Sequence, residues 1–250
     1  MSTISGVQSS TDYAAIASGK KINSAADGAS ELAIATKLET QSQGLEVGAD
    51  NTKDGQNVLN IADGALGGIQ DYLQRIRELS VKAMNGTNSA SDLGAIQKEV
   101  DSMLQGIQTT AKGTEYNTMK LLDGSKADMD IASNPDGSGM KISLANSTLE
   151  ALGIDGYNVT GNFDIGTIDN ALNMVSESRS RIGASTNALE YAYQYNKNAS
   201  LQQTSAQSTL EDLDIPEAVS DMKKNDLLEQ YKNAMLKKQM EEESLVTKLL

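Results

Sequence analysis

Leucines recur every seven residues in the first third of the chain, and this spacing restricts the possible folds more than any other feature. Leu59, Leu66 and Leu73 form one series, and a second series interleaves it: Ala62, Ile69, Ile76 and Ala83. Apolar steps that alternate between three and four residues place both series on one face of a helix. The stripe begins near residues 31–38, so we predict a helix over residues 32–84, about 80 Å long at 1.5 Å per residue. Such a helix needs partners along its length, because helices without tertiary burial are marginal in water.

The segment after this helix supplies the first partner. Asn85-Gly-Thr-Asn-Ser-Ala-Ser contains residues that end one helix and begin another, with Ser89 or Ser91 as the N-cap of the next. Apolar residues then resume at alternating steps of three and four: Leu93, Ile96, Val100, Met103 and Ile107. We therefore predict a chain reversal and a shorter helix that folds back along the first and ends near Gly113.

Two further helices are expected in the last third of the chain. Heptad spacing returns at Ile168, Val175, Ile182 and Leu189, and predicts a helix that continues to about residue 210. Pro216 suits a first helical turn with Asp214 as its cap, so a last helix is expected from Glu217 onward. Its apolar positions are Val219, Met222, Leu228, Tyr231, Met235, Leu245 and Leu249.

The middle of the chain has a different period. Met129 and Ile131, and then Met140, Ile142 and Leu144, stand two apart on either side of a Pro-Asp-Gly turn. This pattern predicts a β-hairpin over residues 127–145. The expected fold is therefore mainly α, a long antiparallel helical rod or coiled-coil-like bundle with a small β-hairpin at mid-chain. Both termini are expected at the same end of it.

Composition excludes several classes of function. The formal net charge of −13 repels phosphate backbones and anionic lipid headgroups, so neither nucleic acid nor a membrane surface is an expected partner. The sequence has no run of about 18 apolar residues that could span a bilayer. It also has no Cys and no His, which removes thiolate nucleophiles, imidazole bases and the common zinc motifs. We expect no enzyme activity, no cofactor and no metal site.

Several short motifs match chemical signatures only loosely. Residues 125–137 fail the register of a calcium-binding loop, and the glycine-rich residues 64–68 lack the Lys of a phosphate loop, so close helix packing is the preferred explanation for those glycines. Three Asn-X-Thr triplets, which begin at Asn85, Asn146 and Asn158, fit the glycosylation pattern and are assigned no role.

Four long blocks resemble bacterial flagellin. They are SGKKINSAADGASELAIATKLETQ (18–41), NVLNIADGALGGIQDYLQRIRELSVKAMNGTNS (57–89), GTEYNTMKLLDG (113–124) and LEDLDIPEAVSDM (210–222). The resemblance implies a hairpin-like chain whose terminal helices form an inner tube and whose longer helices form an outer tube. In those terms the expected regions are 1–31 (N-terminal inner-tube segment and linker), 32–122 (outer-tube helices), 123–164 (β-hairpin and turn-rich connection), 165–209 (returning outer-tube helix) and 210–250 (linker and C-terminal inner-tube helix). The short middle region implies a form without the large outer variable domains.

The resemblance also implies partners. The expected function is a structural subunit of the flagellar filament that forms a helical homopolymer. We expect it to be extracellular and exported without a cleaved signal peptide, since the first residues have no apolar core. A flagellar secretion chaperone would cover the C-terminal helix before export. The alternative is a hook–filament junction protein, a relative of flagellin with similar ends. The first residues are shorter and more polar, and the tail is more charged, than the family usually shows.

Two sets of contact residues follow. Charged residues on the two outer-tube helices are expected to fix the register between subunits, because helical assembly joins different patches of neighbouring copies. The same stretch matches the segment by which host Toll-like receptor 5 recognises the family. The candidate receptor or subunit contacts are Gln74, Arg75, Arg77, Glu78, Leu79, Lys82 and Glu99. The candidate polymerisation tail is Leu228, Tyr231, Leu245 and Leu249. For any one of the charged residues, a merely solvated helix face is the simpler alternative.

Overall fold

A computed structural model describes the backbone of residues 13–249 and the side chains of residues 13–242. The chain divides into two compact units. The central unit is Gln43–Ser200, and the end unit combines residues 1–42 with residues 201–250. The predicted 1–31 segment therefore lies partly outside the described residues.

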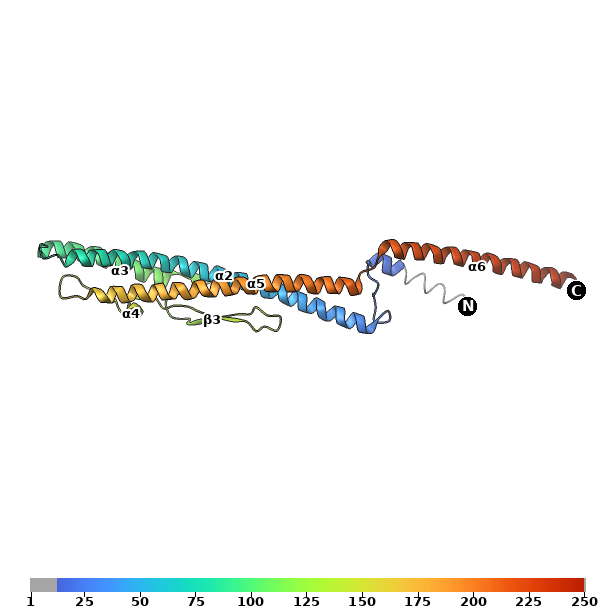
Figure 1. The fold of residues 1–250 in the computed structure, drawn as a ribbon, viewed down its shortest axis with the longest axis horizontal. Coiled ribbons are helices and arrows are strands. Elements are labelled where there is room, and N and C mark those ends of the chain that lie inside the picture. Colours follow the sequence, from blue (N-terminus) through green and yellow to red (C-terminus); the bar gives the residue numbers. More distant parts are fainter. Residues whose placement is uncertain (1–12, 250) are drawn as a thin grey trace. The chain divides into compact units, whose positions relative to one another are not determined.

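Four long helices account for most of the described chain (Figure 1). They are α2 (Ala29–Ala83), α3 (Ala90–Gly113), α5 (Ile165–Glu211) and α6 (Ile215–Leu249). A four-residue helix, α4 (Leu149–Leu152), lies in the connection before α5. Strands β1 (Glu115–Tyr116) and β2 (Met119–Lys120) form one antiparallel pair, and β3 (Asp128–Ile131) and β4 (Met140–Ser143) form another. The predicted mainly α fold with a small mid-chain hairpin is confirmed.

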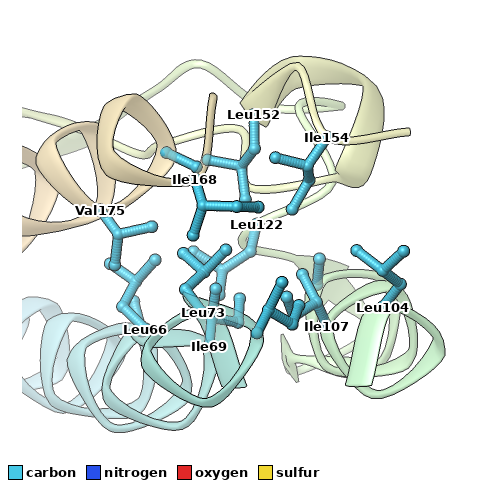
Figure 2. Packing of buried hydrophobic residues seen from close by; sticks show 14 of the residues in the cluster. Leu66, Ile69, Leu73, Leu104, Ile107, Leu122, Leu152, Ile154, Ile168 and Val175 are labelled. Carbon is cyan, nitrogen blue, oxygen red and sulfur yellow. The ribbon is translucent and has the colours of Figure 1, made fainter. Parts of the chain in front are cut away.

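The heptad residues form the core of the central unit. Leu59, Leu66, Leu73 and Ile69 are fully buried on α2, and Ile168 and Leu189 are fully buried on α5. Figure 2 shows side chains of α2, α3 and α5 in one cluster: Leu66 of α2 lies beside Val175 of α5, and Ile69 and Leu73 share the cluster with Leu104 and Ile107 of α3 and Ile168 of α5. The connecting segment closes the same cluster with Leu122, Leu152 and Ile154. Aliphatic side chains thus supply most of this core, and Tyr157 is the one buried aromatic residue in it among the described residues.

Ion pairs that link α2 to α5 show that these two helices are antiparallel. Asp63 pairs with Arg179 at 2.8 Å, whereas Arg77, further along α2, pairs with Asp169, earlier in α5. The order is also reversed against α3, where Arg75 pairs with Glu99 whereas Tyr72, earlier in α2, lies against Gly106, later in α3. Within the central unit the chain therefore runs out along α2, back along α3 and, after the strands, back again along α5 beside α2.

The turn between α2 and α3 has caps on both sides. Ser89 is the N-cap of α3: its side chain accepts a hydrogen bond from the backbone N–H of Asp92, and the Asp92 carboxylate accepts from the backbone N–H of Ser89 at 3.0 Å. This reciprocal capping box satisfies two free helix donors. On the other side, the Asn88 side-chain amide donates to the carbonyl oxygen of Lys82 at 2.7 Å. The structure thus selects Ser89 from the two predicted N-caps.

The tip of the β3–β4 hairpin is fixed against two helices. The register pairs Met129 with Ile142 and Ile131 with Met140, as the alternation predicts. At the tip, the side-chain amide of Asn196 on α5 donates to the carbonyl oxygen of Ser133 at 2.7 Å, and both residues are buried. Asn51 on α2 donates to the carbonyl oxygen of Ala132 at 2.9 Å.

Glycine permits this close approach of the hairpin to α2. A Cβ on Gly48 would overlap the carbonyl oxygen of Ser133 and lie 2.9 Å from its carbonyl carbon. By contrast, a Cβ on Gly64 or Gly68 would meet nothing within 4 Å. Close packing was therefore the wrong explanation for the glycine-rich residues 64–68.

Two short elements were not predicted. The β1–β2 pair turns through Asn117 and Thr118, which have φ values of 45° and 65°. Neither residue belongs to an Asn-Gly or Asp-Gly pair, the strongest short-range hairpin signal, so the sequence gives little warning of this turn. Helix α4 is too short for a period to be visible, although Thr148 caps it and Gly153 ends it in the left-handed region at φ 70°.

The end unit joins the two linkers. Lys20 forms a β-bridge with Asp212, and the backbone N–H of Lys21 donates to the carbonyl oxygen of Glu211 at 2.7 Å. The Lys20 ammonium also contacts the buried Glu211 carboxylate at 2.7 Å. Helix α6 then begins at Ile215, and the Asp214 side chain accepts from the backbone N–H of Glu217, as a cap does. The predicted roles of Asp214 and Pro216 in starting the last helix are confirmed.

Candidate assembly and recognition surface

Six of the predicted contact residues are polar side chains on the outer side of α2 and α3 in the central unit. We call them together the charged surface; its members are Gln74, Arg75, Arg77, Glu78 and Lys82 on α2 and Glu99 on α3. The α2 members are exposed and Glu99 is half-buried. They lie on the polar side of the helices because the heptad positions between them are occupied by core residues.

Arg75 connects the two helices of this surface. Its guanidinium contacts the Glu99 carboxylate through two nitrogens, Nη2 at 2.6 Å and Nε at 2.9 Å, and contacts Glu78 at 3.0 Å. These hydrogen bonds, the one with Glu99 first, raise the pKa of the Arg75 guanidinium. Arg75 presents a fixed orientation because its planar group is held by two carboxylates.

Arg77 connects α2 to α5 instead. Its Nε lies 2.6 Å from the Asp169 carboxylate, and about half of the Arg77 side chain remains exposed. Lys82 lies near the α2–α3 turn and contributes weakly to the lowered pKa of the Asp92 carboxylate, which is due chiefly to hydrogen bonds from Ser89. The charges predicted to meet other molecules are thus already partly engaged within the chain, while their side chains remain accessible.

Leu79 does not belong to the charged surface. It is only 3% exposed and is part of the central core cluster, because it stands three residues after the core residue Ile76 and beside the heptad positions Ser80 and Ala83. The prediction of Leu79 as a direct contact residue is wrong for the folded monomer. Leu79 contributes to the motif indirectly, because its packing in the core holds the neighbouring Arg75 and Glu78 in position.

Helix α6 carries a second exposed surface, which is apolar. Every described residue from Tyr231 to Glu242 is exposed. Leu228 is 48% exposed and Tyr231 is 63% exposed, while the side chains of Leu245 and Leu249 lie outside the described residues. The large exposed apolar side chains of α6 are Ile215, Leu227, Leu228, Tyr231, Met235, Leu236 and Met240. We call them the apolar residues of α6.

The start of α6 lines a hollow of about 520 Å³ inside the end unit. Ile16, Leu213 and Met222 provide apolar walls, and Asp214 and Glu217 are among the carboxylates at its rim. In the part of the chain that the structure describes, no group of three or more acidic side chains has a metal-binding arrangement. Across the same residues, no helix is both long and apolar enough to cross a bilayer.

Long helices with a closed aliphatic core, and a further helix whose large apolar side chains are uncovered, are typical of a structural protein that associates with other chains, since exposed apolar surface marks interaction sites. The family model for the bacterial flagellin N-terminal helical region matches residues 5–127, and that for the C-terminal helical region matches residues 165–250. A flagellin from Halalkalibacterium halodurans is 32% identical over 94% of this chain and 89% of its own length. The chain belongs to the bacterial flagellin family. Flagellins are structural proteins of the flagellar filament.

Solved structures agree with this assignment. The crystal structure of Bacillus cereus flagellin is 27% identical, covers 59% of this chain and 88% of its own, and superposes with a TM-score of 0.52. A chain described as a flagellar hook-associated protein from Vibrio parahaemolyticus superposes with a TM-score of 0.63 at 15% identity, over 74% of this chain and 100% of its own. The second likeness shows the fold alone.

Proposed function

We propose that this flagellin polymerises into an extracellular filament that serves motility, and that α6 provides the main self-association surface. The exposure of the apolar residues of α6 is the observation that supports this proposal most strongly. The central unit buries a continuous core and exposes seven large apolar side chains spread over residues 43–200, whereas α6 exposes the same number, between 46% and 71%, within 35 residues. Burying such side chains against identical copies provides a favourable free energy of about 25 cal/mol per Å² of apolar area removed from water.

In this proposal the charged surface sets the geometry of assembly. Exposed, oriented charges discriminate between registers more than they add affinity, because correct pairing is rewarded and like charges repel. Arg75 and Glu99 are suited to this role because their mutual contact holds both side chains in one orientation. Contacts from neighbouring subunits would extend this network.

Seeded polymerisation followed by electron microscopy tests the proposal. Purified monomer should extend filament seeds into long tubes, and the double variant Leu228→Gln/Tyr231→Gln should raise the monomer concentration needed for growth. Gln230→Ala is the matched control, since Gln230 is an exposed polar residue on the same part of α6. Equal growth of the double variant and the control would exclude α6 as the main surface.

The same assay separates the alternative of a hook–filament junction protein. The fold likeness to a hook-associated protein is compatible with this alternative. A junction protein would bind a filament end in a few copies and stop, because its function needs no long homopolymer. Short caps without elongation would therefore favour it over the filament subunit.

We further propose that the charged surface of the monomer binds host Toll-like receptor 5. The accessibility of Arg75 and Glu99 on two adjoining helices supports this proposal, as does the match of the motif around them. Arg75→Ala and Glu99→Ala should weaken binding to the receptor ectodomain, measured by surface plasmon resonance. Lys98→Ala is the control, because Lys98 is an exposed charge next to Glu99 in the sequence. Unchanged affinity in both test variants would refute this role.

A flagellar secretion chaperone is the third proposed partner. Uncovered apolar side chains on α6 would favour aggregation before export, so a chaperone that covers them is expected. Its co-purification with the intact chain, and its loss on removal of residues 215–250, would support this role. We also propose export without cleavage, which predicts that peptides from residues 1–12 are present in filaments sheared from cells.

A further inference from the structure

Asn85 and Gly86 form the single Asn-Gly pair in the sequence. They lie in the turn between α2 and α3, two and three residues after α2 ends at Ala83. Both residues are exposed. The pair is therefore accessible to water in a segment outside the helical hydrogen-bond ladder.

The local geometry favours attack of the Gly86 nitrogen on the Asn85 side chain. The Asn85 Oδ1 accepts a hydrogen bond from the backbone N–H of Thr87 at 3.2 Å, which folds the side chain over the following peptide. This hydrogen bond also withdraws electron density from the side-chain carbonyl carbon. Among the described residues, no group accepts a hydrogen bond from the Gly86 N–H, and apart from its two chain neighbours no residue has an atom within 4 Å of the position where a Cβ would stand.

We propose that Asn85 is a site of spontaneous deamidation. The Gly86 backbone nitrogen loses its proton and bonds to the Asn85 Cγ, the Cγ–Nδ2 bond breaks, and ammonia leaves with that proton. The resulting five-membered succinimide is then hydrolysed by one water molecule. Opening at one carbonyl gives aspartate, and opening at the other gives isoaspartate, in which the main chain passes through the former side chain. No oxidant, metal or enzyme is needed.

Neighbouring candidates lack this combination. Asn88 is followed by Ser89, whose side chain crowds the attacking nitrogen, and its amide is held by the carbonyl oxygen of Lys82. The Asp-Gly pairs at Asp123 and Asp136 carry carboxylates, whose pKa values are lowered by hydrogen bonds from Ser125 and Ser138 respectively. A carboxylate anion is a poor electrophile, so these pairs react more slowly than an amide.

Deamidation would change the end of α2 in a defined way. Either product places a negative charge just beyond the C-terminus of a 55-residue helix, where the helix dipole disfavours anions. Isoaspartate also inserts one extra carbon into the main chain of the turn that the Asn88 and Ser89 caps stabilise. The modified residue would lie three residues from Lys82 of the charged surface. Because the reaction is spontaneous, the modified fraction would rise with the age of the protein.

Incubation of the folded full-length chain in H₂¹⁸O at mildly alkaline pH tests the proposal. Trypsin cleavage after Lys82 and Lys98 releases one peptide with both Asn85 and Asn88, and fragmentation mass spectrometry locates the label within it. We expect ¹⁸O at residue 85 in two isomeric peptides, faster labelling at higher pH, and methylation of one isomer by an isoaspartyl methyltransferase.

Two variants make the test decisive. Gly86→Ala should slow labelling while leaving the fold intact, because its Cβ would meet nothing within 4 Å and Gly86 does not have a positive φ. Asn88→Gln is the control and should leave labelling at residue 85 in place. Absence of label at residue 85, equal labelling of Asn85 and Asn88, or an unchanged rate in Gly86→Ala would each overturn the proposal.

Discussion

Replacing Leu79 by alanine should destabilise the central unit far more than replacing its neighbour Arg75. Leu79 is 3% exposed and packs in the main core cluster, so truncation removes buried aliphatic carbon and leaves a cavity. Substitutions of this kind cost about 2–5 kcal/mol of the free energy of unfolding. With a urea m-value of about 2 kcal/mol/M, the unfolding midpoint should fall by roughly 1–2.5 M.

Urea unfolding of the monomer, followed by far-UV circular dichroism, measures this difference. Arg75→Ala should shift the midpoint much less, because the side chains of Arg75 and Glu99 are 50% and 41% exposed and water screens their attraction. A variant that replaced Arg75 and Leu79 together would therefore confound stability with recognition, whereas Arg75→Ala alone tests contact. A small shift for Leu79→Ala, or an equal shift for Arg75→Ala, would refute the placement of Leu79 in the core.

Three further predictions concern single positions. Gly48→Ala should lower the free energy of unfolding by about 1–3 kcal/mol, because its Cβ would overlap the Ser133 carbonyl and the backbone must move. An unaltered thermal midpoint would contradict this. Gly64→Ala should instead stabilise α2 by about 0.5–1 kcal/mol, because an exposed helical glycine loses more backbone entropy than alanine; chemical denaturation provides the measurement. Hydrogen bonds from Ser89 lower the pKa of the Asp92 carboxylate, so its contribution to stability is present above the unfolded-state pKa and is lost as pH falls through the lowered folded value. In Asp92→Asn, the thermal unfolding midpoint should fall less as the pH is lowered than it does in the unsubstituted protein. An identical dependence of the midpoint on pH would show that this cap does not titrate.

The periodic parts of the fold were predictable because burial and spacing coincide. Leu59, Leu66, Leu73, Ile168 and Leu189 all occupy fully buried positions. A heptad repeat reports the side of a helix that meets its partners, so it also predicts their antiparallel arrangement once the turns are found. The last helix was located by Pro216 and Asp214, which act through local backbone chemistry.

The features that escaped prediction depend on contacts between distant segments. No local signal indicates that Asn196 and Asn51 would hold the hairpin tip, or that Gly48 would lie against Ser133. Leu79 was misplaced for a related reason: a match to a contiguous motif does not distinguish a residue that touches a partner from one that supports its neighbours. The spacing of Leu79, three residues after the core residue Ile76, was the available signal.

The central claim is that the central unit is complete in the monomer, whereas α6 becomes covered only when copies associate. Amide hydrogen exchange, measured by mass spectrometry on monomer and on seeded polymer, tests this claim most directly. In the monomer, amides of residues 223–242 should exchange much faster than those of residues 59–79, because exposed helices open locally. In the polymer, residues 223–242 should become protected while residues 59–79 change little. Strong protection of residues 223–242 in the monomer, or none gained in the polymer, would contradict the account.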